Sequence, residues 1–314
     1  MNTGIKIKKN VPLAPLTTFK VGGRAKFFVE VKDKNELLAA IEWSKKNGIG
    51  LCILGGGSNV LISDKVINRI FIKLKNTEIN VKNNQIRCGA GAVLHAVVQK
   101  TIKNKLTGLE WAAGIPGTIG GAVRGNALAF KSTMNEVVQK VEVFDLQKNK
   151  FIILNKKQCC FSNKSSIFKQ NNNFIIWDIY LKLKREQEEK ILANYKFCLG
   201  VRRNHPKLPS AGCIFKNLSA QYVRKNSPQL YEEAINNKIV RNNLVSAGWV
   251  ISRTSLPGKN VGGAKISADH ANFIVNTGKT KSEEIVILIS LVKQKIRTEF
   301  NLQLQEEIEY IGFD

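Results

Sequence analysis

Apolar and polar residues in the first part of the chain follow both helical and strand-like patterns. Residues 33–47 place apolar side chains at helical spacing behind a plausible N-cap, Asp33, and stop before Gly48, so a helix is predicted there. Short apolar runs predict strands, and these runs lie at 51–54, 60–62 and 69–74. The first part of the chain is therefore predicted to be a mixed α and β unit.

The middle of the chain continues this mixture. An amphipathic pattern predicts a helix at 93–102. Strands are predicted at 85–88, 138–145, 151–154 and 174–184. Residues 114–127 are different, because they hold too much glycine for a stable helix interior and are too long for a turn.

A boundary is predicted near residue 205. A polar helix at 186–203 leads into the sequence HPKLP at 205–209, which is typical of a break between units. Beyond it, helices are predicted near 245–253 and at 282–300. Strands are predicted around Ile214, at Val261, at Phe273 and at 306–311.

Composition limits the class of protein. A chain of 314 residues has room for two or three packed units, and no apolar run approaches the roughly 18 to 20 residues that cross a bilayer. The N-terminus lacks the apolar stretch of a secretory signal, so a cytoplasmic protein is expected. Six cysteines without a CxxC pair, together with only three histidines, predict free thiols and no metal site.

The net charge of +25 permits two interpretations. A basic protein can bind nucleic acid, a membrane surface or phosphorylated ligands. The lysines and arginines are dispersed in ones and twos, however, which favours ordinary solvated faces with anionic ligands as a partial contributor. A nucleic-acid-binding protein stays the competing hypothesis, although the chain carries no recognised RNA or DNA motif.

Two glycine-rich segments are the main candidates for ligand binding. The first, LGGGSN at 54–59, follows a predicted strand, where successive backbone N–H groups can converge on an anion, although a tight turn without a ligand is about equally expected. The second spans 114–126, where apolar residues between the glycines predict an ordered segment that lies close to a ligand. Neither is a Rossmann fingerprint, since no strand–GxGxxG–helix unit with a downstream acid is present, and no complete P-loop exists.

Short motifs along nearly the whole chain occur in the order and spacing of one enzyme family. They are LTTFKVGG at 16–23, LGGGSN at 54–59, GAG at 89–91, GLE at 108–110, GIPGTIGGA at 114–122, NA at 126–127, PSAG at 209–212, FKN at 215–217, AGW at 247–249 and VGGA at 261–264, followed by His270, Asn276 and Glu307. Together they resemble the UDP-N-acetylenolpyruvoylglucosamine reductases.

The resemblance implies an α+β chain with an FAD-binding fold of the vanillyl-alcohol-oxidase type. Two FAD-binding subdomains are expected at 1–75 and 76–196, with 303–314 returning to the active-site cleft. A C-terminal α/β substrate-binding domain is expected at 197–302. The chain is similar to the shorter form of the family, which lacks an extra tyrosine-bearing loop.

The same resemblance implies the chemistry. NADPH would reduce FAD, and the flavin N5 would deliver hydride to C3 of the enolpyruvyl substrate before C2 is protonated, which gives UDP-N-acetylmuramate. The expected partner is this small molecule, with no nucleic acid and no membrane. The residues implied to hold FAD are Leu54, Gly55, Gly56, Gly57, Ser58, Asn59, Gly114, Pro116, Gly117, Thr118, Gly120, Gly121 and Ala122. FAD is expected to be non-covalent, because neither glycine segment contains histidine or cysteine.

The implied active-site residues depart from the family pattern at three places. Lys164 occupies the position of an arginine beside the substrate carboxylate, and Cys213 that of the serine proton donor. A lysine is replaced by Pro257, which leaves Lys259 as a stand-in for phosphate contact. The family's catalytic glutamate matches Glu307, and the implied substrate-binding residues are Lys216, Asn217 and Lys259.

Two alternatives follow from these departures. The chain could be a degenerate or repurposed flavoprotein, but Lys164 and Cys213 keep charge and acidity, which favours retained activity. It could also be another oxidase or dehydrogenase on the same FAD fold that acts on a sugar or alcohol. The C-terminal third, with FKN at 215–217 and VGGA at 261–264, argues against that interpretation. Residues 218–243 form a longer connection than the family leads us to expect.

Overall fold

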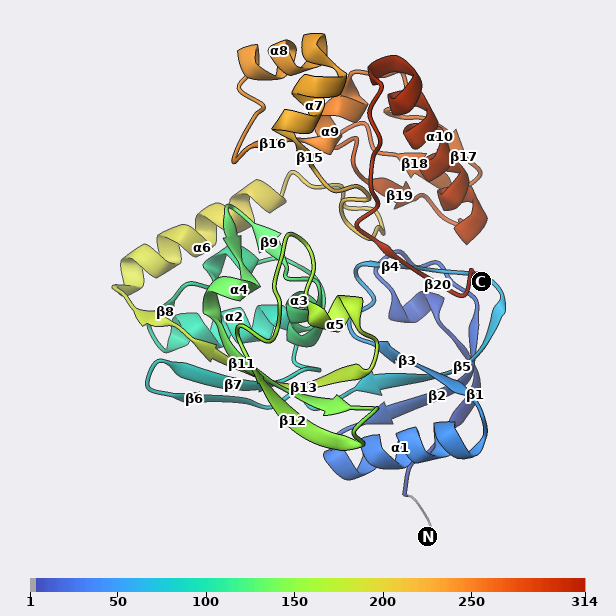
Figure 1. Cartoon of the computed structure of the whole chain (residues 1–314), viewed down its shortest axis with the longest axis vertical. Helices are drawn as coiled ribbons and strands as arrows, with labels where there is room; N and C mark the ends of the chain where they lie inside the picture. The colour runs from blue at the N-terminus through green and yellow to red at the C-terminus, as the bar shows by residue number, and fades with distance from the viewer. Residues whose placement is uncertain (1–3, 314) are drawn as a thin grey trace. The chain divides into compact units, whose positions relative to one another are not determined.

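The computed structural model describes residues 4–313, which form two compact units (Figure 1). Unit 1 consists of residues 4–11, 25–56 and 68–203, and unit 2 of residues 12–24, 57–67 and 204–313. Each unit has a hydrophobic core of its own. The chain therefore contributes two short N-terminal segments to unit 2 before it enters that unit for good at residue 204.

The first sheet of unit 1 contains β1 (Lys8–Pro12), β2 (Arg24–Val31), β3 (Gly50–Leu54) and β5 (Val66–Leu74). The strand order is β1-β2-β5-β3, and β3 runs parallel to β5. The helix α1 (Lys34–Lys46) begins after Asp33, whose side chain accepts a hydrogen bond from the Glu36 amide at 2.9 Å. The helix predicted at 33–47 is confirmed together with its N-cap.

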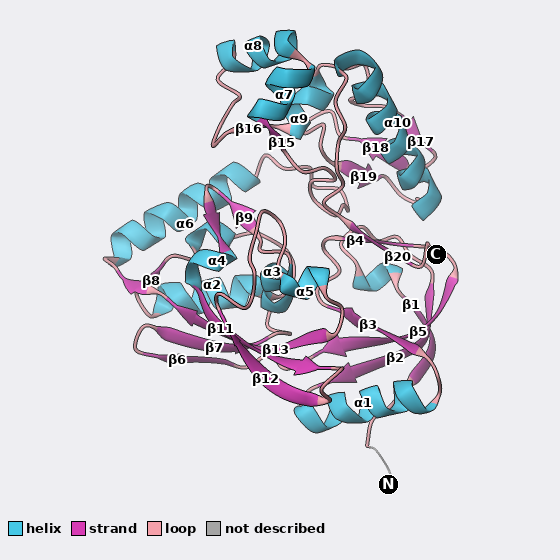
Figure 2. Cartoon of the chain, in the orientation of Figure 1, coloured by secondary structure: helices cyan, strands magenta, loops and turns pink. Residues whose placement is uncertain are grey.

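The second sheet of unit 1 is antiparallel throughout. Its strands are β6 (Ile79–Lys82), β7 (Gln85–Gly89), β11 (Val138–Asp145), β12 (Lys150–Asn155) and β13 (Phe174–Lys182), in the order β12-β11-β13-β7-β6. Helix α3 (Ile119–Arg124) packs on β13 and β7, α2 (Leu94–Lys103) packs on α3, and α6 (Glu188–Arg202) packs on α2 (Figure 2). The helices thus cover the sheet in successive layers, and the predicted strands of this region are confirmed.

Shorter elements complete unit 1. They are β8 (Leu106–Thr107), η2 (Glu110–Ala112), β9 (Leu128–Ala129), β10 (Ser132–Thr133), α4 (Met134–Val137), α5 (Ile167–Gln170) and β14 (Lys184–Arg185). The elements from β8 to α4 lie in the connection between β7 and β11, α5 lies between β12 and β13, and β14 follows β13 and pairs with β8.

The interpretation of 114–127 as too glycine-rich for a helix is wrong for its second half. Helix α3 begins after Thr118, whose side chain accepts a hydrogen bond from the Gly121 amide at 3.2 Å. A Cβ on Gly120 would lie 2.8 Å from the Ala90 carbonyl oxygen. The glycine that weakens the helix is therefore what allows it to pack against the chain at Ala90, and tertiary contact outweighs propensity.

Unit 2 is built around a small antiparallel sheet and several helices. The sheet is β17-β18-β19, formed by β17 (Asn260–Val261), β18 (Ala264–Ile266) and β19 (Ile274–Asn276). It packs against α10 (Ser282–Phe300), whose bounds are those predicted from the sequence. Other elements of unit 2 are η1 (Ala14–Leu16), β4 (Val60–Ile62), α9 (Ala247–Ser252) and β20 (Glu309–Ile311), which pairs with β4 in parallel.

The long connection at 218–243 is folded. Its two ends pair as β15 (Leu218–Ser219) and β16 (Leu244–Val245), and between them α7 (Ala220–Asn226) and α8 (Pro228–Asn236) pack on each other. Neither these nor the other helices within residues 4–313 are long and apolar enough to cross a membrane.

Candidate functional site

Unit 1 brings the two glycine-rich segments into direct contact. A Cβ on Gly56 would lie 2.5 Å from the Gly117 Cα, and one on Gly55 would lie 2.9 Å from the Thr118 Oγ1. Real Cβ atoms are not found at the first of these distances from backbone. The two loops can therefore approach each other only because side chains are missing at these positions.

The second segment is anchored by backbone hydrogen bonds to the residues that follow β7. The Gly120 amide donates to the Ala90 carbonyl at 3.0 Å and the Ile119 amide to the Ala92 carbonyl at 2.9 Å. Gly121, in contrast, is exposed, and the nearest atom to a Cβ placed there would be the Thr118 Oγ1 at 3.6 Å. The segment thus has a fixed inner side and an open outer side of bare backbone, which suits a planar or phosphorylated ligand such as FAD.

The end of the first glycine loop belongs to unit 2. Gly57 is buried, and its carbonyl accepts a hydrogen bond from the Thr18 amide at 3.0 Å. The Thr18 hydroxyl donates to the Ser210 carbonyl at 2.7 Å. The Asn59 side chain donates to the Glu307 carbonyl at 3.1 Å. Within unit 2, residues 57–59 and Thr18 are therefore hydrogen-bonded, directly or through each other, to the two segments that carry Cys213 and Glu307.

Unit 2 places Cys213 and Glu307 on neighbouring extended segments. Cys213 pairs with Phe273 on one side in an isolated β-bridge. On the other side, the Glu307 amide donates to the Ile214 carbonyl at 2.7 Å. Residues around Ile214 were predicted to form a strand, but they form single bridges, and regular pairing of the C-terminal strand begins only at Glu309. Backbone pairing nevertheless brings together the two segments that carry the residues predicted to act on the substrate.

The predicted substrate-binding residues continue from the same segment. Lys216 is half-buried and its amide donates to the Gln305 carbonyl at 2.9 Å. The Asn217 Oδ1 accepts a hydrogen bond from the Ala247 amide at 3.1 Å, at the start of α9. Lys259 is exposed on a separate turn just before β17.

Lys164 lies in unit 1, in a tight turn held on the end of the second glycine segment. Ser162 and Ser165 pair with each other across this turn. The Asn126 side chain donates to the Ser162 carbonyl at 2.8 Å, and the Ser166 hydroxyl donates to the Arg124 carbonyl at 2.6 Å. The turn that carries Lys164 is therefore fixed to the C-terminal end of α3.

Comparison with known proteins identifies the family. A model described as the UDP-N-acetylenolpyruvoylglucosamine reductase C-terminal domain matches residues 204–311, and an FAD binding domain matches residues 25–153. The chain is 33% identical over 315 residues to the UDP-N-acetylenolpyruvoylglucosamine reductase of Caldicellulosiruptor bescii. This alignment covers 99% of this chain and 92% of that protein. The same enzyme of Solibacter usitatus is 30% identical over 98% of this chain and 97% of its own length.

This chain belongs to the UDP-N-acetylenolpyruvoylglucosamine reductase family.

A solved structure agrees with this family. The UDP-N-acetylenolpyruvylglucosamine reductase of Thermus caldophilus matches with a TM-score of 0.79 and 30% identity, over 98% of this chain and all of that one. The fold class predicted from the sequence, an FAD-binding fold followed by a reductase-specific C-terminal domain, is confirmed. The chain is an FAD-dependent oxidoreductase, and the glycine segments described above fit that cofactor.

Most of the other cysteines of this reductase are unsuited to chemistry. Burial raises the pKa of the Cys159 thiol to about 12 and also raises the pKa values of Cys88 and Cys198. These thiols stay protonated near neutral pH, so they pack as small core residues. Cys213 is half-buried.

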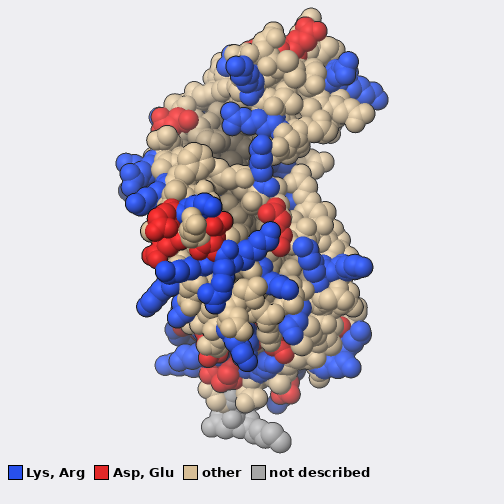
Figure 3. All heavy atoms as spheres, turned by 90° about the vertical axis from the view of Figure 1, so that its left-hand side faces the viewer, with Lys and Arg blue, Asp and Glu red and all other residues tan. Residues whose placement is uncertain are grey.

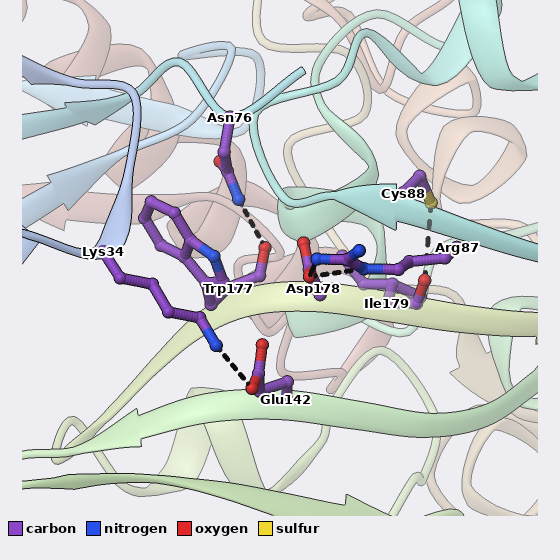
Figure 4. Close-up of polar contacts among 8 residues, drawn as sticks. All are labelled: Lys34, Asn76, Arg87, Cys88, Glu142, Trp177, Asp178 and Ile179. Atoms are coloured by element: carbon purple, nitrogen blue, oxygen red, sulfur yellow. Dashed lines mark hydrogen bonds and ion pairs between the residues drawn. The ribbon is translucent and has the colours of Figure 1, made fainter. Parts of the chain in front are cut away.

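Two ion pairs of unit 1 involve no predicted site residue (Figure 4). The Arg87 guanidinium donates to the Asp178 Oδ2 at 2.6 and 2.8 Å. Burial raises the pKa of Asp178, and the hydrogen bond from Arg87 opposes that rise. Lys34 Nζ lies 2.7 Å from Glu142 Oε1, so this ion pair joins the start of α1 to β11.

Basic side chains surround two surface hollows of this reductase in unit 1. The hollows have volumes of about 730 and 310 Å³, and lysines and arginines of β6, β7, β11, β13 and β14 line them. None of the lining residues is a predicted site residue. Figure 3 shows Lys and Arg at many places on the face in view, with groups of acidic side chains among them.

Two buried asparagines hold the candidate site but were not predicted as site residues. Asn126 fixes the turn of Lys164, and Asn272 fixes the segment of Cys213. Both are less than 5% exposed. Asn126 stands in a family motif of the sequence, whereas nothing in the sequence near Asn272 indicates that its partner is Phe215.

Proposed function

We propose that this chain reduces UDP-N-acetylenolpyruvoylglucosamine to UDP-N-acetylmuramate, with NADPH as the reductant. Family membership over almost the whole chain supports this reaction. The observation that supports the assignment of residues is the backbone pairing of the Cys213 and Glu307 segments, which lie next to each other in unit 2.

The glycine segments would hold FAD without a covalent bond. The residues proposed for this are Leu54, Gly55, Gly56, Gly57, Ser58, Asn59, Gly114, Pro116, Gly117, Thr118, Gly120, Gly121 and Ala122. Bare backbone at Gly121 and the close approach of Gly56 to Gly117 support the proposal. When bound, FAD would accept hydride from NADPH and supply it to C3 of the substrate.

The protein's own residues would bind the substrate and move one proton. Cys213 would donate its thiol proton to C2, since a thiol is a much stronger acid than the serine hydroxyl that it replaces. The Glu307 carboxyl group would share a proton with the developing enolate and so stabilise its negative charge before C2 is protonated. Lys164 would pair with the substrate carboxylate, and Lys216, Asn217 and Lys259 would bind the rest of the substrate.

Reduction of the flavin by NADPH and its reoxidation by the substrate can be tested on one sample. The purified protein should be yellow, NADPH should bleach it without oxygen, and UDP-N-acetylenolpyruvoylglucosamine should restore the colour. Acid precipitation should release all of the flavin if it is non-covalent. A colourless protein that FAD does not reconstitute would contradict the flavin site, and a bleached protein that the enolpyruvyl substrate does not reoxidise would contradict the reaction.

A further inference from the structure

The segment that carries Cys213 has no regular strand beside it. Its backbone pairs through isolated bridges, Cys213 with Phe273 and Phe215 with Glu306. Phe215 is only 2% exposed, so its N–H and C=O groups cannot be hydrated and need partners within the protein. Something other than a β-ladder must therefore satisfy them.

The side chain of Asn272 supplies both missing partners. Its Oδ1 accepts a hydrogen bond from the Phe215 amide at 2.9 Å, and its Nδ2 donates to the Phe215 carbonyl at 2.8 Å. The backbone carbonyl of Asn272 also accepts a hydrogen bond from the Ile214 amide at 2.8 Å. The amide side chain offers a donor and an acceptor at the same time, and here it takes the place of a neighbouring strand.

These contacts lie next to the backbone of both residues predicted to be catalytic. Ile214 and Phe215 directly follow Cys213, and the residue after Asn272 is Phe273, which pairs with Cys213 itself. On the other side of the segment, the Ile214 carbonyl accepts a hydrogen bond from the Glu307 amide at 2.7 Å. A shift of the segment would therefore change the position of the Cys213 thiol and its spacing from Glu307 together.

We propose that Asn272 is a positioning residue that sets the place of the Cys213 thiol for proton transfer to the substrate. Its side chain does so by hydrogen-bonding both backbone groups of Phe215. This inference rests on the proposed function for the reaction itself, but the position of the thiol can be measured without it.

A matched control exists in the same unit. Asn276 is also buried, at 7% exposure, and its side chain donates to the Phe19 carbonyl at 3.0 Å and accepts from the Gly278 amide at 2.8 Å. It lies four residues after Asn272, on β19, and within residues 4–313 its side chain bonds to Phe19, Lys20, Gly278 and Thr280 and not to 213–217. Asn276→Ala should therefore lower stability as Asn272→Ala does, but leave the Cys213 segment in place.

The test compares the two half-reactions of the FAD-loaded proteins by stopped-flow absorbance. In Asn272→Ala, bleaching by NADPH should stay within about twofold of the parent protein, whereas reoxidation by the substrate should slow by about 10- to 100-fold, because an ångström-scale displacement of a reacting group has effects of that size. In Asn276→Ala, both rates should stay within about twofold. Equal slowing of reoxidation in the two variants would overturn the proposal.

A second measurement reports on the thiol directly. The alkylation rate of Cys213 by iodoacetamide, followed by peptide mass spectrometry, should change about fivefold or more in Asn272→Ala and stay unchanged in Asn276→Ala. Cys160, an exposed thiol of unit 1, serves as the internal reference. An unchanged Cys213 rate in Asn272→Ala would refute the positioning role. Failure of the parent protein to reduce the substrate would instead refute the proposed function and leave this comparison valid.

An isosteric variant keeps the test decisive if Asn272→Ala does not fold. Asn272→Asp retains the acceptor for the Phe215 amide but loses the donor for the Phe215 carbonyl when it is ionised. Burial favours protonation of this carboxyl, which restores a donor. The reoxidation defect of Asn272→Asp should therefore diminish relative to the parent protein between pH 8 and pH 6. A defect that is the same at both pH values would count against the proposal.

Discussion

The glycine segments of unit 1 and the Cys213 segment of unit 2 are positioned in opposite ways. In unit 1, backbone packs directly against backbone, as where Gly56 meets Gly117 and Gly120 meets Ala90, and missing side chains make the arrangement possible. In unit 2, the key segment lacks a full β-ladder, and the Asn272 side chain completes its hydrogen bonding. Substitutions that add side-chain atoms should therefore disrupt the glycine segments of unit 1, whereas substitutions that remove side-chain atoms should disrupt the Cys213 segment of unit 2.

The largest effect is expected when the Cys213 thiol is removed. Cys213→Ala should still be bleached by NADPH but should be reoxidised by the substrate about a thousandfold more slowly, because the proton donor at C2 is gone. Cys213→Ser should retain measurable turnover. Stopped-flow absorbance separates the two half-reactions. Full turnover in Cys213→Ala would remove the assignment of Cys213 as the proton donor.

Glu307 should affect the same half-reaction to a smaller extent. Glu307→Gln keeps the shape of the side chain, and its backbone bond to Ile214 is unchanged. Reoxidation by the substrate should slow on the order of a hundredfold, since charge stabilisation is lost only late in the reaction, while bleaching by NADPH stays nearly intact. Equal slowing of both half-reactions would indicate a structural role.

Variants of Lys164 test whether a side chain of unit 1 also binds the substrate. Lys164→Met should raise the KM for the enolpyruvyl substrate and slow its reduction by about 30-fold, because the substrate carboxylate loses its cation. Lys164→Arg keeps the charge and adds a bidentate fork, so it should retain or improve activity. Steady-state kinetics with a fixed NADPH concentration measures both. Wild-type behaviour of Lys164→Met would assign the carboxylate to another cation.

Long elements and chemical motifs were easier to predict from the sequence than contacts between residues that lie far apart along the chain. Helix α10 was predicted with its correct bounds because 19 residues of sustained periodicity give a strong signal. Helix α3 was missed because its six residues include two glycines, and the contact at Ala90 that stabilises it is invisible in local sequence. Asn272 was missed for the same reason, since its partner Phe215 lies 57 residues away.

Gly56 tests the backbone contact in unit 1. Gly56→Ala would place a methyl group 2.5 Å from the Gly117 Cα, so the two loops must separate. Affinity for FAD should fall by about tenfold or more, measured by titration of the apoprotein with FAD and flavin fluorescence. Gly50→Ala, at the start of the strand β3 that precedes this loop, is the control, because its Cβ would meet only the Arg69 Cγ at 3.9 Å. Equal flavin affinity in both variants would contradict the importance of this contact.

The smallest effect is expected at Gly121, where a substitution tests whether this side of α3 contacts the cofactor. Gly121 is exposed on α3, and a Cβ there would meet nothing closer than 3.6 Å. Gly121→Ala should therefore leave the apoprotein as stable as before or slightly more stable, by up to about 1 kcal/mol, since alanine is the better helix former. FAD affinity should nevertheless fall severalfold, because the methyl group occupies the surface that the cofactor needs. Thermal unfolding of the apoprotein and FAD titration measure the two effects separately. If stability rises and FAD affinity is unchanged, Gly121 does not face the cofactor, and the contact side of α3 must be sought elsewhere.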